Sequence, residues 1–570
     1  MRLNISESAT HSWQYYPPIP VSSPVIALAV AGEKIWAGGF NGVACYETGW
    51  RLLSADLTLA SVTALCYTGG WLVAGGPDGI ARSADGGFRW ESAEIDGSIS
   101  PVASLAAAPD FGREPALLAA TIGGGTLRSE NAGRTWKYTN FGLQNFDVFG
   151  LSWRADDVVL AATADGIYRS NNGGRAWRAA RGTEGFGFSA VTFLPNGDAL
   201  AAIDTGGLMR SVDGGGSWQT YAVLAEDVQV MAMAAKDGGG VWLGTAMNGT
   251  MHLSDGEVEI LDEAGALAFA SEGSRMAVGL PDGAGLINGS SISRLPSPPL
   301  HDLRVLHISC GNLLAAGLYS GVWIWRDETG WYPLEAPDMV TALVEAPDGA
   351  LILSGTSGLL RSPEGGSTWQ SCLPGEGGLV ARITFRPDGV GWAGSADGER
   401  LLRTRDYGLT WEPLASPFGV MPLVALQVAP DRLFAATFNP PRQTAQLWYS
   451  LDDGDSWLRG AEARTNWPVV ATSGDPALIT LGGNLFLLQA DGSWGSRKVG
   501  EKGSGVRRIA SDGETIMALT SADLLRTVDR GVLWTIEPDL PPLDEIMDIA
   551  IYSGKLYLLL TGGRVCARAL

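Results

Sequence analysis

Aspartates recur along this 570-residue chain in one fixed context, and a search for catalytic carboxylates selects them first. In eight segments an Arg or Tyr, a Ser or Thr, an acidic or amide residue, a Gly and a Trp follow one another at constant spacing. We call these segments the acidic turns; they are 82–90, 128–136, 169–177, 210–218, 361–369, 403–411, 449–457 and 526–534. The acidic position is occupied by Asp85, Asp213, Asp406, Asp452 and Asp529 in five of them. Ser or Thr two residues before Asp folds side-chain oxygens onto the N–H groups of a tight turn, in which Gly takes a positive φ. The pattern therefore favours a structural role over acid–base catalysis.

A second set of aspartates lies in short turns of the type Pro-Asp-Gly or Ala-Asp-Gly and their variants. If several of them ring one channel mouth, they could bind a cation or a basic segment of a partner. The alternative, which we favour, is that they only form turns, for which Asp and Gly are well suited. The set consists of Asp78, Asp165, Asp204 and Asp282 in the first half and Asp397 and Asp523 in the second.

One stretch reverses the local charge of an otherwise acidic chain. Within twelve residues it carries Arg497, Lys498, Lys502, Arg507 and Arg508. We expect it at the rim of the structure, where it would dock an anion or a protein partner. The alternative is an ordinary solvated loop.

Other chemistries lack support in the sequence. The four His residues have no partner at a metal-ligand spacing, and the five Cys residues never form a Cys-x-x-Cys pair. There is no Gly-x-Ser-x-Gly elbow, and no Gly-rich run is followed by Lys-Ser or Lys-Thr. We therefore predict no catalytic residue, no metal and no cofactor.

The overall charge limits the classes of partner. Asp and Glu number 61 against 40 Lys and Arg, so the formal net charge is −21. Such a chain repels phosphate backbones and anionic lipid, so nucleic acid and membrane are not expected partners. The N-terminal residues do not resemble a signal peptide, and no apolar run is long enough to span a membrane. We expect a cytoplasmic protein, with a secreted mature chain as the alternative.

The acidic turns belong to a longer repeat that must position all of these residues. Their Trp residues and those of degenerate copies lie 37 to 46 residues apart, except for one gap of 113, which is three such periods. Each unit contains four short apolar runs separated by Gly-containing turns, the pattern of a β-propeller blade. Fourteen units exceed the usual size of one ring. The sequence thus predicts an all-β fold of two tandem seven-bladed β-propellers, built from fourteen four-stranded blades.

Internal similarity suggests where the first ring ends. The stretch 32–50 resembles 311–331, and the segments before them also match, so we predict one propeller over 1–290 and another over 291–570. The last unit has only three strands. We therefore expect Trp13–Tyr16 to close blade seven and Ser291–Leu295 to close blade fourteen. In the alternative threading the N-terminal strand joins the second ring, which makes that domain discontinuous.

The repeated acidic turns resemble the Asp-box, or BNR repeat. In a tandem pair of seven-bladed rings, the chain resembles the glycoside hydrolase family 74 xyloglucanases, and more loosely the photosystem II assembly propellers and sortilin. The first resemblance implies hydrolysis of glucan chains in a cleft between the rings, by one aspartate from each ring. The matching positions here are approximately Gly39 and Gly317, and neither loop contains a carboxylate. Inverting hydrolysis needs two carboxyl groups, one acid and one base, so the activity is not expected to carry over.

These observations favour a non-catalytic double propeller that acts as a protein-interaction or assembly scaffold. Rigid rings with many exposed turns suit recognition by loops held on a stiff frame. A protein partner is therefore expected. The alternative is a family 74-like hydrolase of xyloglucan or β-glucan, or a degenerate relative that binds glycan.

Overall fold

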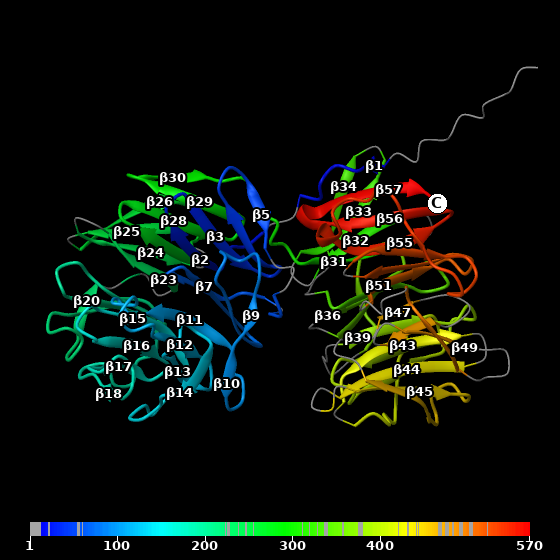
Figure 1. Ribbon diagram of the computed structural model, residues 1–570, viewed down its shortest axis with the longest axis horizontal. Coiled ribbons are helices and arrows are strands. Elements are labelled where there is room, and N and C mark those ends of the chain that lie inside the picture. The colour runs from blue at the N-terminus through cyan, green and yellow to red at the C-terminus, as the bar shows by residue number, and fades with distance from the viewer. Residues whose placement is uncertain are drawn as a thin grey trace, which may run out of the picture. The chain divides into compact units, whose positions relative to one another are not determined.

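The computed structural model describes most of the chain. The described residues are 13–20, 23–53, 57–59, 61–222, 224, 228–236, 239–245, 248–254, 256–309, 312–317, 320–327, 329–335, 340–355, 358–373, 380–419, 421–429, 432–439, 442, 444–464, 470–472, 478–481, 484–488, 494–500, 506–520 and 522–570. Over these ranges the strands form fourteen sheets (Figure 1), as the sequence predicts. No helix in this part of the chain is long and apolar enough to cross a bilayer.

The first ring is built from seven antiparallel sheets whose strands follow one another in chain order, the first being innermost. Strand β2 packs against both β6 and β27, so the seventh blade meets the first and the ring closes. Both faces of each sheet are covered by neighbouring blades, which is why second strands such as β12 (Leu117–Thr121) are buried throughout. The innermost strands are β2 (Ala27–Ala31), β6 (Ala64–Thr68), β11 (Val102–Ala107), β15 (Val148–Trp153), β19 (Phe188–Phe193), β23 (Val230–Ala235) and β27 (Ala268–Glu272).

One blade of this ring departs from the four-stranded pattern. Strand β10 (Glu94–Asp96) lies parallel to the outer strand β14 (Thr135–Tyr138) and adds a fifth strand to the third sheet. The pairing covers the outer edge of that blade, which would otherwise present unpaired backbone groups.

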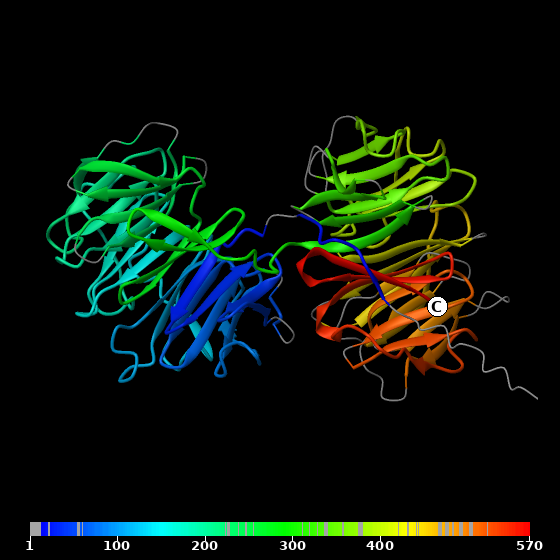
Figure 2. The same ribbon diagram turned by 90° about the horizontal axis from the view of Figure 1, so that it is seen from above.

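The second ring repeats the architecture. Its first innermost strand, β31, packs against β35 on one side and β55 on the other, which closes the ring. Figure 2, turned by 90° from Figure 1, shows the blades of each ring from above. The innermost strands are β31 (Leu303–Ser309), β35 (Ala342–Glu345), β39 (Val380–Phe385), β43 (Leu423–Ala429), β47 (Val470–Thr472), β51 (Val506–Ser511) and β55 (Ile546–Tyr552).

The expected closure of the two rings is wrong, and the alternative threading is confirmed. Strand β30 (Ser291–Arg294) pairs with β29 (Gly283–Asn288) and completes blade seven, while β1 (Gln14–Tyr15) pairs with β57 (Arg564–Ala569) and completes blade fourteen. A short turn joins β29 to β30, so the local hairpin forms and the N-terminal strand is left for the second ring. The compact units are Val21–His301 and Met1–Pro20 with Asp302–Leu570, which differs from the expected division at residue 290.

Side chains reinforce the N-terminal strand of the second ring. The Arg568 guanidinium lies 4.5 Å from the ring centroid of Trp13 and forms a buried ion pair with Glu537. The N–H of Tyr16 donates to the Val565 carbonyl at 2.9 Å. The Trp331 indole donates to the Pro17 carbonyl at 2.8 Å. These contacts fix residues 13–17 along the last blade.

Candidate functional site

The carboxylates of the acidic turns are held by their own turns. The Ser83 hydroxyl donates to Asp85 at 2.8 Å and accepts from the Gly87 N–H at 2.8 Å. The Arg89 N–H donates to the same carboxylate at 2.9 Å. These bonds, that of Arg89 first, lower the pKa of Asp85, although some desolvation opposes them. The Asp85 carboxylate, which accepts hydrogen bonds from its own turn, therefore has the structural role that the sequence indicates.

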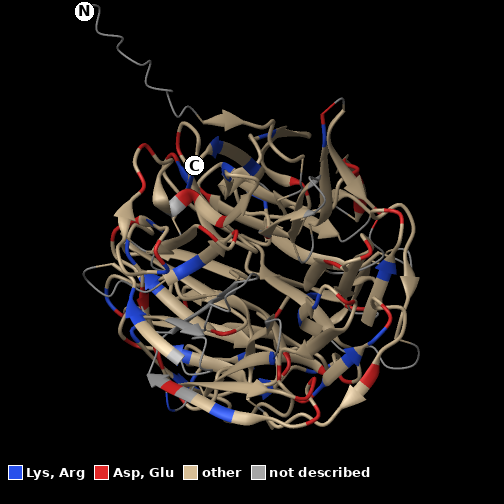
Figure 3. Cartoon of the chain, turned by 90° about the vertical axis from the view of Figure 1, so that its right-hand side faces the viewer, with Lys and Arg blue, Asp and Glu red and all other residues tan. Residues whose placement is uncertain are grey.

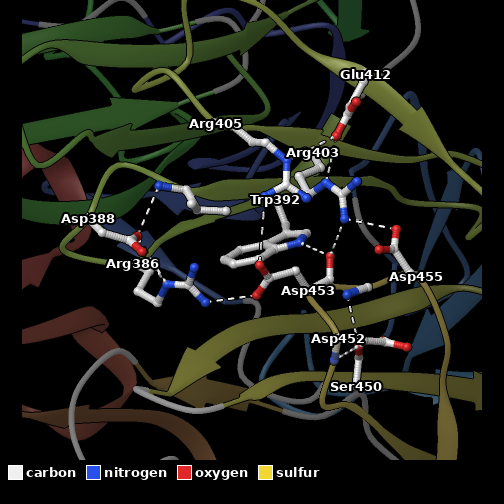
Figure 4. A network of polar contacts seen from close by, with 12 residues as sticks. Arg386, Asp388, Trp392, Arg403, Arg405, Glu412, Ser450, Asp452, Asp453 and Asp455 are labelled. Atoms are coloured by element: carbon white, nitrogen blue, oxygen red, sulfur yellow. Dashed lines mark hydrogen bonds and ion pairs between the residues drawn. The ribbon is translucent and has the colours of Figure 1, made fainter.

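In five blades the Arg that opens an acidic turn donates to a carbonyl of the acidic turn of the next blade. Figure 4 shows the arrangement in the second ring, where Arg403 donates to the Asp453 carbonyl at 3.1 Å and to the Asp455 carboxylate at 2.9 Å. The buried Trp392 indole donates to the same carbonyl at 2.8 Å, and Arg386 binds the Asp453 carboxylate at 2.8 Å. In the first ring Arg128 binds the carbonyl of Gly173 in the same way. The recurring Arg therefore links adjacent blades by hydrogen bonds.

All six aspartates of the second set lie in turns between the second and third strands of their blades. Asp165 accepts from the Thr163 hydroxyl at 2.8 Å, and Asp397 accepts from the Glu399 N–H at 3.0 Å, each within its own turn. Asp282 pairs with Arg294 on the closing strand of its blade. Within the described residues, no three His, Cys, Asp or Glu side chains gather closely enough to hold a metal ion. These contacts favour turn formation for Asp165, Asp282 and Asp397; Asp78, Asp204 and Asp523 occupy equivalent turns.

Gly39 and Gly317, the positions singled out by the resemblance in sequence, have no space for a side chain. A Cβ on Gly39 would lie 2.8 Å from the Pro24 carbonyl oxygen, and one on Gly317 would lie 2.6 Å from the Asp302 carbonyl oxygen. Asp302 itself is buried, and its carboxylate accepts from the N–H of Ser320 at 2.9 Å and from the hydroxyl of the same residue. Its side chain therefore holds the loop after Gly317.

The structure separates the predicted basic stretch into two parts. Arg497 and Lys498 end β50 (Trp494–Lys498), the outermost strand of blade twelve. Arg507 and Arg508 lie on β51, the innermost strand of blade thirteen. The expected rim position therefore fits Arg497 and Lys498, whereas Arg507 and Arg508 lie on an innermost strand. Lys502 lies outside the described residues.

The rim part lies beside an exposed apolar turn. Arg497 donates to the Arg530 carbonyl at 2.8 Å, and the Trp534 indole donates to the Lys498 carbonyl at 3.1 Å. These bonds attach β50 to the acidic turn of blade thirteen. Four aliphatic side chains of this turn and of β54 (Thr535–Ile536), which follows it, are exposed by 64 to 67%. We define the rim patch as Arg497, Lys498, Val528, Arg530, Val532, Leu533 and Ile536.

Comparison among the acidic turns shows that the fold does not require Leu533. In two other turns the residue before Trp is Ser217 or Thr410, whose hydroxyl donates to the aspartate of the turn at 2.7 or 2.6 Å. In two more, Arg89 and Ala176 offer the turn their backbone N–H. Leu533 offers Asp529 only its backbone N–H, at 2.9 Å. Sequence reasoning missed this residue, although alignment of the eight turns would have revealed it. The structure of the turn therefore does not explain why the Leu533 side chain is aliphatic and exposed.

Charge on the second ring is not gathered into one large surface of a single sign. On the side drawn in Figure 3, Lys and Arg are interspersed with Asp and Glu along the blades. Many Arg residues in this ring pair with neighbouring acids, as Arg361 does with Asp348 and Arg564 with Glu545. On this side of the second ring, any group of like charges is therefore small.

Comparisons with known proteins support the architecture. No protein-family model and no curated protein sequence matches the chain. Among solved structures, the GH74 xyloglucanase from Xanthomonas campestris is 15% identical, with a TM-score of 0.59 over 98% of this chain and 100% of that one. The GH74 enzyme of Niastella koreensis is 14% identical, with a TM-score of 0.58 over 97% of this chain and 99% of that one. An ancestral GH74 enzyme is 13% identical, with a TM-score of 0.53 over 98% of both chains. At these identities the likeness shows the fold alone: this chain folds like the GH74 double propellers.

Proposed function

We propose that this double propeller is a non-catalytic interaction scaffold, and that a protein partner docks on the rim patch. The observation that carries the proposal is the exposed apolar turn of blade thirteen. Leu533 stands where turns such as those of Ser217 and Thr410 place a hydroxyl that bonds to the turn, and Val528, Val532 and Ile536 lie exposed beside it. Exposed aliphatic clusters rimmed by polar residues are typical of interaction sites.

The charges around these aliphatic residues indicate the chemistry of the partner. Arg497, Lys498 and Arg530 are exposed at the same turn, on a chain of net charge −21. A segment with apolar side chains flanked by carboxylates would complement this patch, because charge complementarity steers association and apolar contact slows dissociation. In this proposal the acidic turns are Asp-boxes with a structural role, and a cytoplasmic location stays a prediction.

The second candidate is a family 74-like enzyme or glycan-binding relative. The fold favours it, since three of the structural neighbours are GH74 enzymes. The crowded Gly39 and Gly317 positions argue against the family's pair of carboxylates. Reducing-sugar release and affinity electrophoresis on xyloglucan and other β-glucans decide between the candidates. Hydrolysis would reject the scaffold proposal, and binding alone would support a glycan-binding module.

The scaffold proposal is tested by partner capture with matched variants. In the double variant Val532→Ser and Leu533→Ser, the hydroxyl at 533 can donate to Asp529 as Ser217 does to Asp213, so the turn is kept while its apolar surface is lost. The control is Leu409→Ser, which removes an exposed aliphatic residue from the acidic turn of blade ten.

Quantitative mass spectrometry would compare proteins crosslinked to the wild type and to each variant. We expect at least one protein to be lost from the double variant and from a charge reversal at Arg497 and Lys498, but retained by Leu409→Ser. Binding of that protein, once purified, should weaken at least about tenfold in the double variant. Identical capture by all variants would contradict docking at the rim patch.

A further inference from the structure

A β-bulge near the start of many innermost strands defines equivalent positions in different blades. In many of them the register with the second strand shifts by one residue after the first pair, so the residue that follows the bulge occupies an equivalent place in each blade. In the first ring these residues are small and uncharged: Ser104, Gly150, Ala190 and Ala232. In the second ring they are Val305, Arg382, Ala425, Arg508 and Asp548. The second ring therefore places charges at a level where the first has none.

Arg382 is the least compensated of these charges. It lies on an innermost strand, yet its side chain is exposed, so it borders the space at the centre of the ring. Its guanidinium donates to the Val424 carbonyl at 2.9 Å and to the Ala381 carbonyl at 2.7 Å. Desolvation, and then the nearby charge of Arg508, lower the pKa of Arg382. In the described part of the chain it forms no ion pair with a carboxylate.

Arg508 has one acidic neighbour among the residues that the structure describes. Its Nε lies 3.4 Å from Asp548 Oδ1, and its guanidinium also donates to the Arg507 carbonyl at 2.9 Å. The other oxygen of Asp548 accepts from the Leu306 N–H at 2.9 Å. Burial raises the pKa of Asp548 to about 6, against the opposing effects of Arg508 and of the Leu306 N–H. Asp548 therefore compensates Arg508, whereas no described carboxylate pairs with Arg382.

This arrangement costs free energy unless a further anion is present. Two like charges in a partly desolvated space repel, and a guanidinium that loses hydrating water without gaining a counter-charge is destabilised. A second polar group lies on an innermost strand of the same ring without a partner: the buried Nε2 of His307, two residues beyond Val305. Burial lowers the pKa of His307 against the opposing charge of Glu345, and the neutral imidazole can donate one hydrogen bond.

We propose that the centre of the second ring binds a small multivalent oxyanion, of the phosphate type, between Arg382 and Arg508. Planar guanidinium groups present paired N–H donors that match the oxygens of such an anion. The site is independent of the rim patch, which lies at the outer end of blade thirteen.

The test is a titration of the full-length chain with inorganic phosphate at constant ionic strength, followed by calorimetry and by thermal unfolding. We expect saturable heat and a thermal midpoint that rises with phosphate concentration, as binding to the native state requires. Arg382→Gln and Arg508→Gln should each weaken binding at least about tenfold. Arg382→Lys, which keeps the positive charge but loses the paired N–H donors of the guanidinium group, should bind phosphate with intermediate affinity. Arg497→Gln, at the rim, should bind like the wild type.

A purely structural role for Arg382 makes a different prediction. Gln can still donate to the Val424 carbonyl, so if capping that strand were its only role, phosphate would stabilise Arg382→Gln as much as the wild type. That result would overturn the proposal, as would the absence of saturable heat at about 10 mM phosphate. Without phosphate, we expect Arg382→Gln to unfold at the same or a higher temperature than the wild type, because a repulsion is removed. Malonate binding that depends on both Arg residues would support the site and identify a dicarboxylate as its preferred anion.

Discussion

At the scale of single residues, hydrogen bonds distinguish aspartates that stabilise their turn from aspartates whose side chains contribute little to stability. Asp213 accepts from the Gly216 N–H at 2.9 Å, and from the N–H and hydroxyl of Ser217 at 2.9 and 2.7 Å. Desolvation opposes these bonds, but together they lower the pKa of Asp213. Asp204, in the next turn upstream, shows only a backbone bond to Gly187. The two aspartates should therefore respond differently to removal.

We predict that Asp213→Ala lowers the free energy of unfolding by about 1–2 kcal/mol, since it removes several turn-capping bonds. Asp204→Ala is the matched control and should change stability by less than about 0.5 kcal/mol. Urea unfolding of both variants measures the difference. Equal losses would show that the acidic turns contribute no more than ordinary surface turns.

The buried carboxyl of Asp548 predicts a pH effect of defined sign. Its pKa is raised to about 6 in the folded chain, chiefly by desolvation, so the folded state holds the proton more tightly than the unfolded state does. Its contribution to stability is therefore fully present below the unfolded pKa and is lost as pH rises through about 6. Relative to Asp548→Asn, the wild type should lose about 2 kcal/mol of stability between about pH 4 and neutral pH. A stability difference that does not change with pH, measured by urea unfolding, would contradict the raised pKa.

At the scale of elements, the N-terminal strand is the feature on which the second ring most depends. Strand β1 contributes only two ladder residues, so side-chain contacts must add to its backbone pairing. Trp13 stacks on Arg568, whose charge is paired with Glu537 inside the protein. Loss of the aromatic ring would expose that ion pair and free the edge of the last blade.

We predict that Trp13→Ala lowers the stability of the second ring by about 2–4 kcal/mol. Hydrogen exchange followed by mass spectrometry should show faster exchange in β55, in β56 (Lys555–Leu560) and in β57, with the first ring unchanged. Tyr15→Ala serves as the control, because Tyr15 is 58% exposed and has little packing to lose. Faster exchange spread equally over both rings would contradict this assignment of the strand.

At the scale of the whole molecule, the two rings close by different means. The first ring is continuous, and its own strand β30 completes it, whereas the second requires residues from the beginning of the chain. A fragment of residues 21–301 should therefore fold cooperatively by itself. A fragment of residues 302–570 should fold less stably and gain stability when a peptide of residues 13–20 is added. Calorimetry of the two fragments, with a scrambled peptide as control, checks both expectations; a stable 302–570 fragment that ignores the peptide would contradict them.

Much of the architecture could be predicted because it is repeated. Each repeat contains the residues that form its own turn, such as Ser83, Asp85 and Gly87. Because the pattern recurs many times, it can be recognised even where single copies have diverged. The structural role of the acidic turns and of the Arg that opens them follows from the same local logic.

The candidate site was only partly predictable. Arg497 and Arg508 are close in sequence but lie on the outermost strand of one blade and the innermost strand of the next. Arg382 was not among the predicted site residues, because no motif near it indicates that Arg508, more than 120 residues away, occupies the equivalent position of another blade.

The blade, the number of blades and the role of the acidic turns follow from the amino-acid sequence, because they depend on contacts within about 40 residues and are repeated. Three features required the three-dimensional structure: which strand closes each ring, which half of the basic stretch reaches the rim, and which charges share one level at the centre of the second ring. The reason is physical: closing a ring joins segments hundreds of residues apart, as β1 and β57 are, and strand pairing of that kind leaves no local pattern in the sequence.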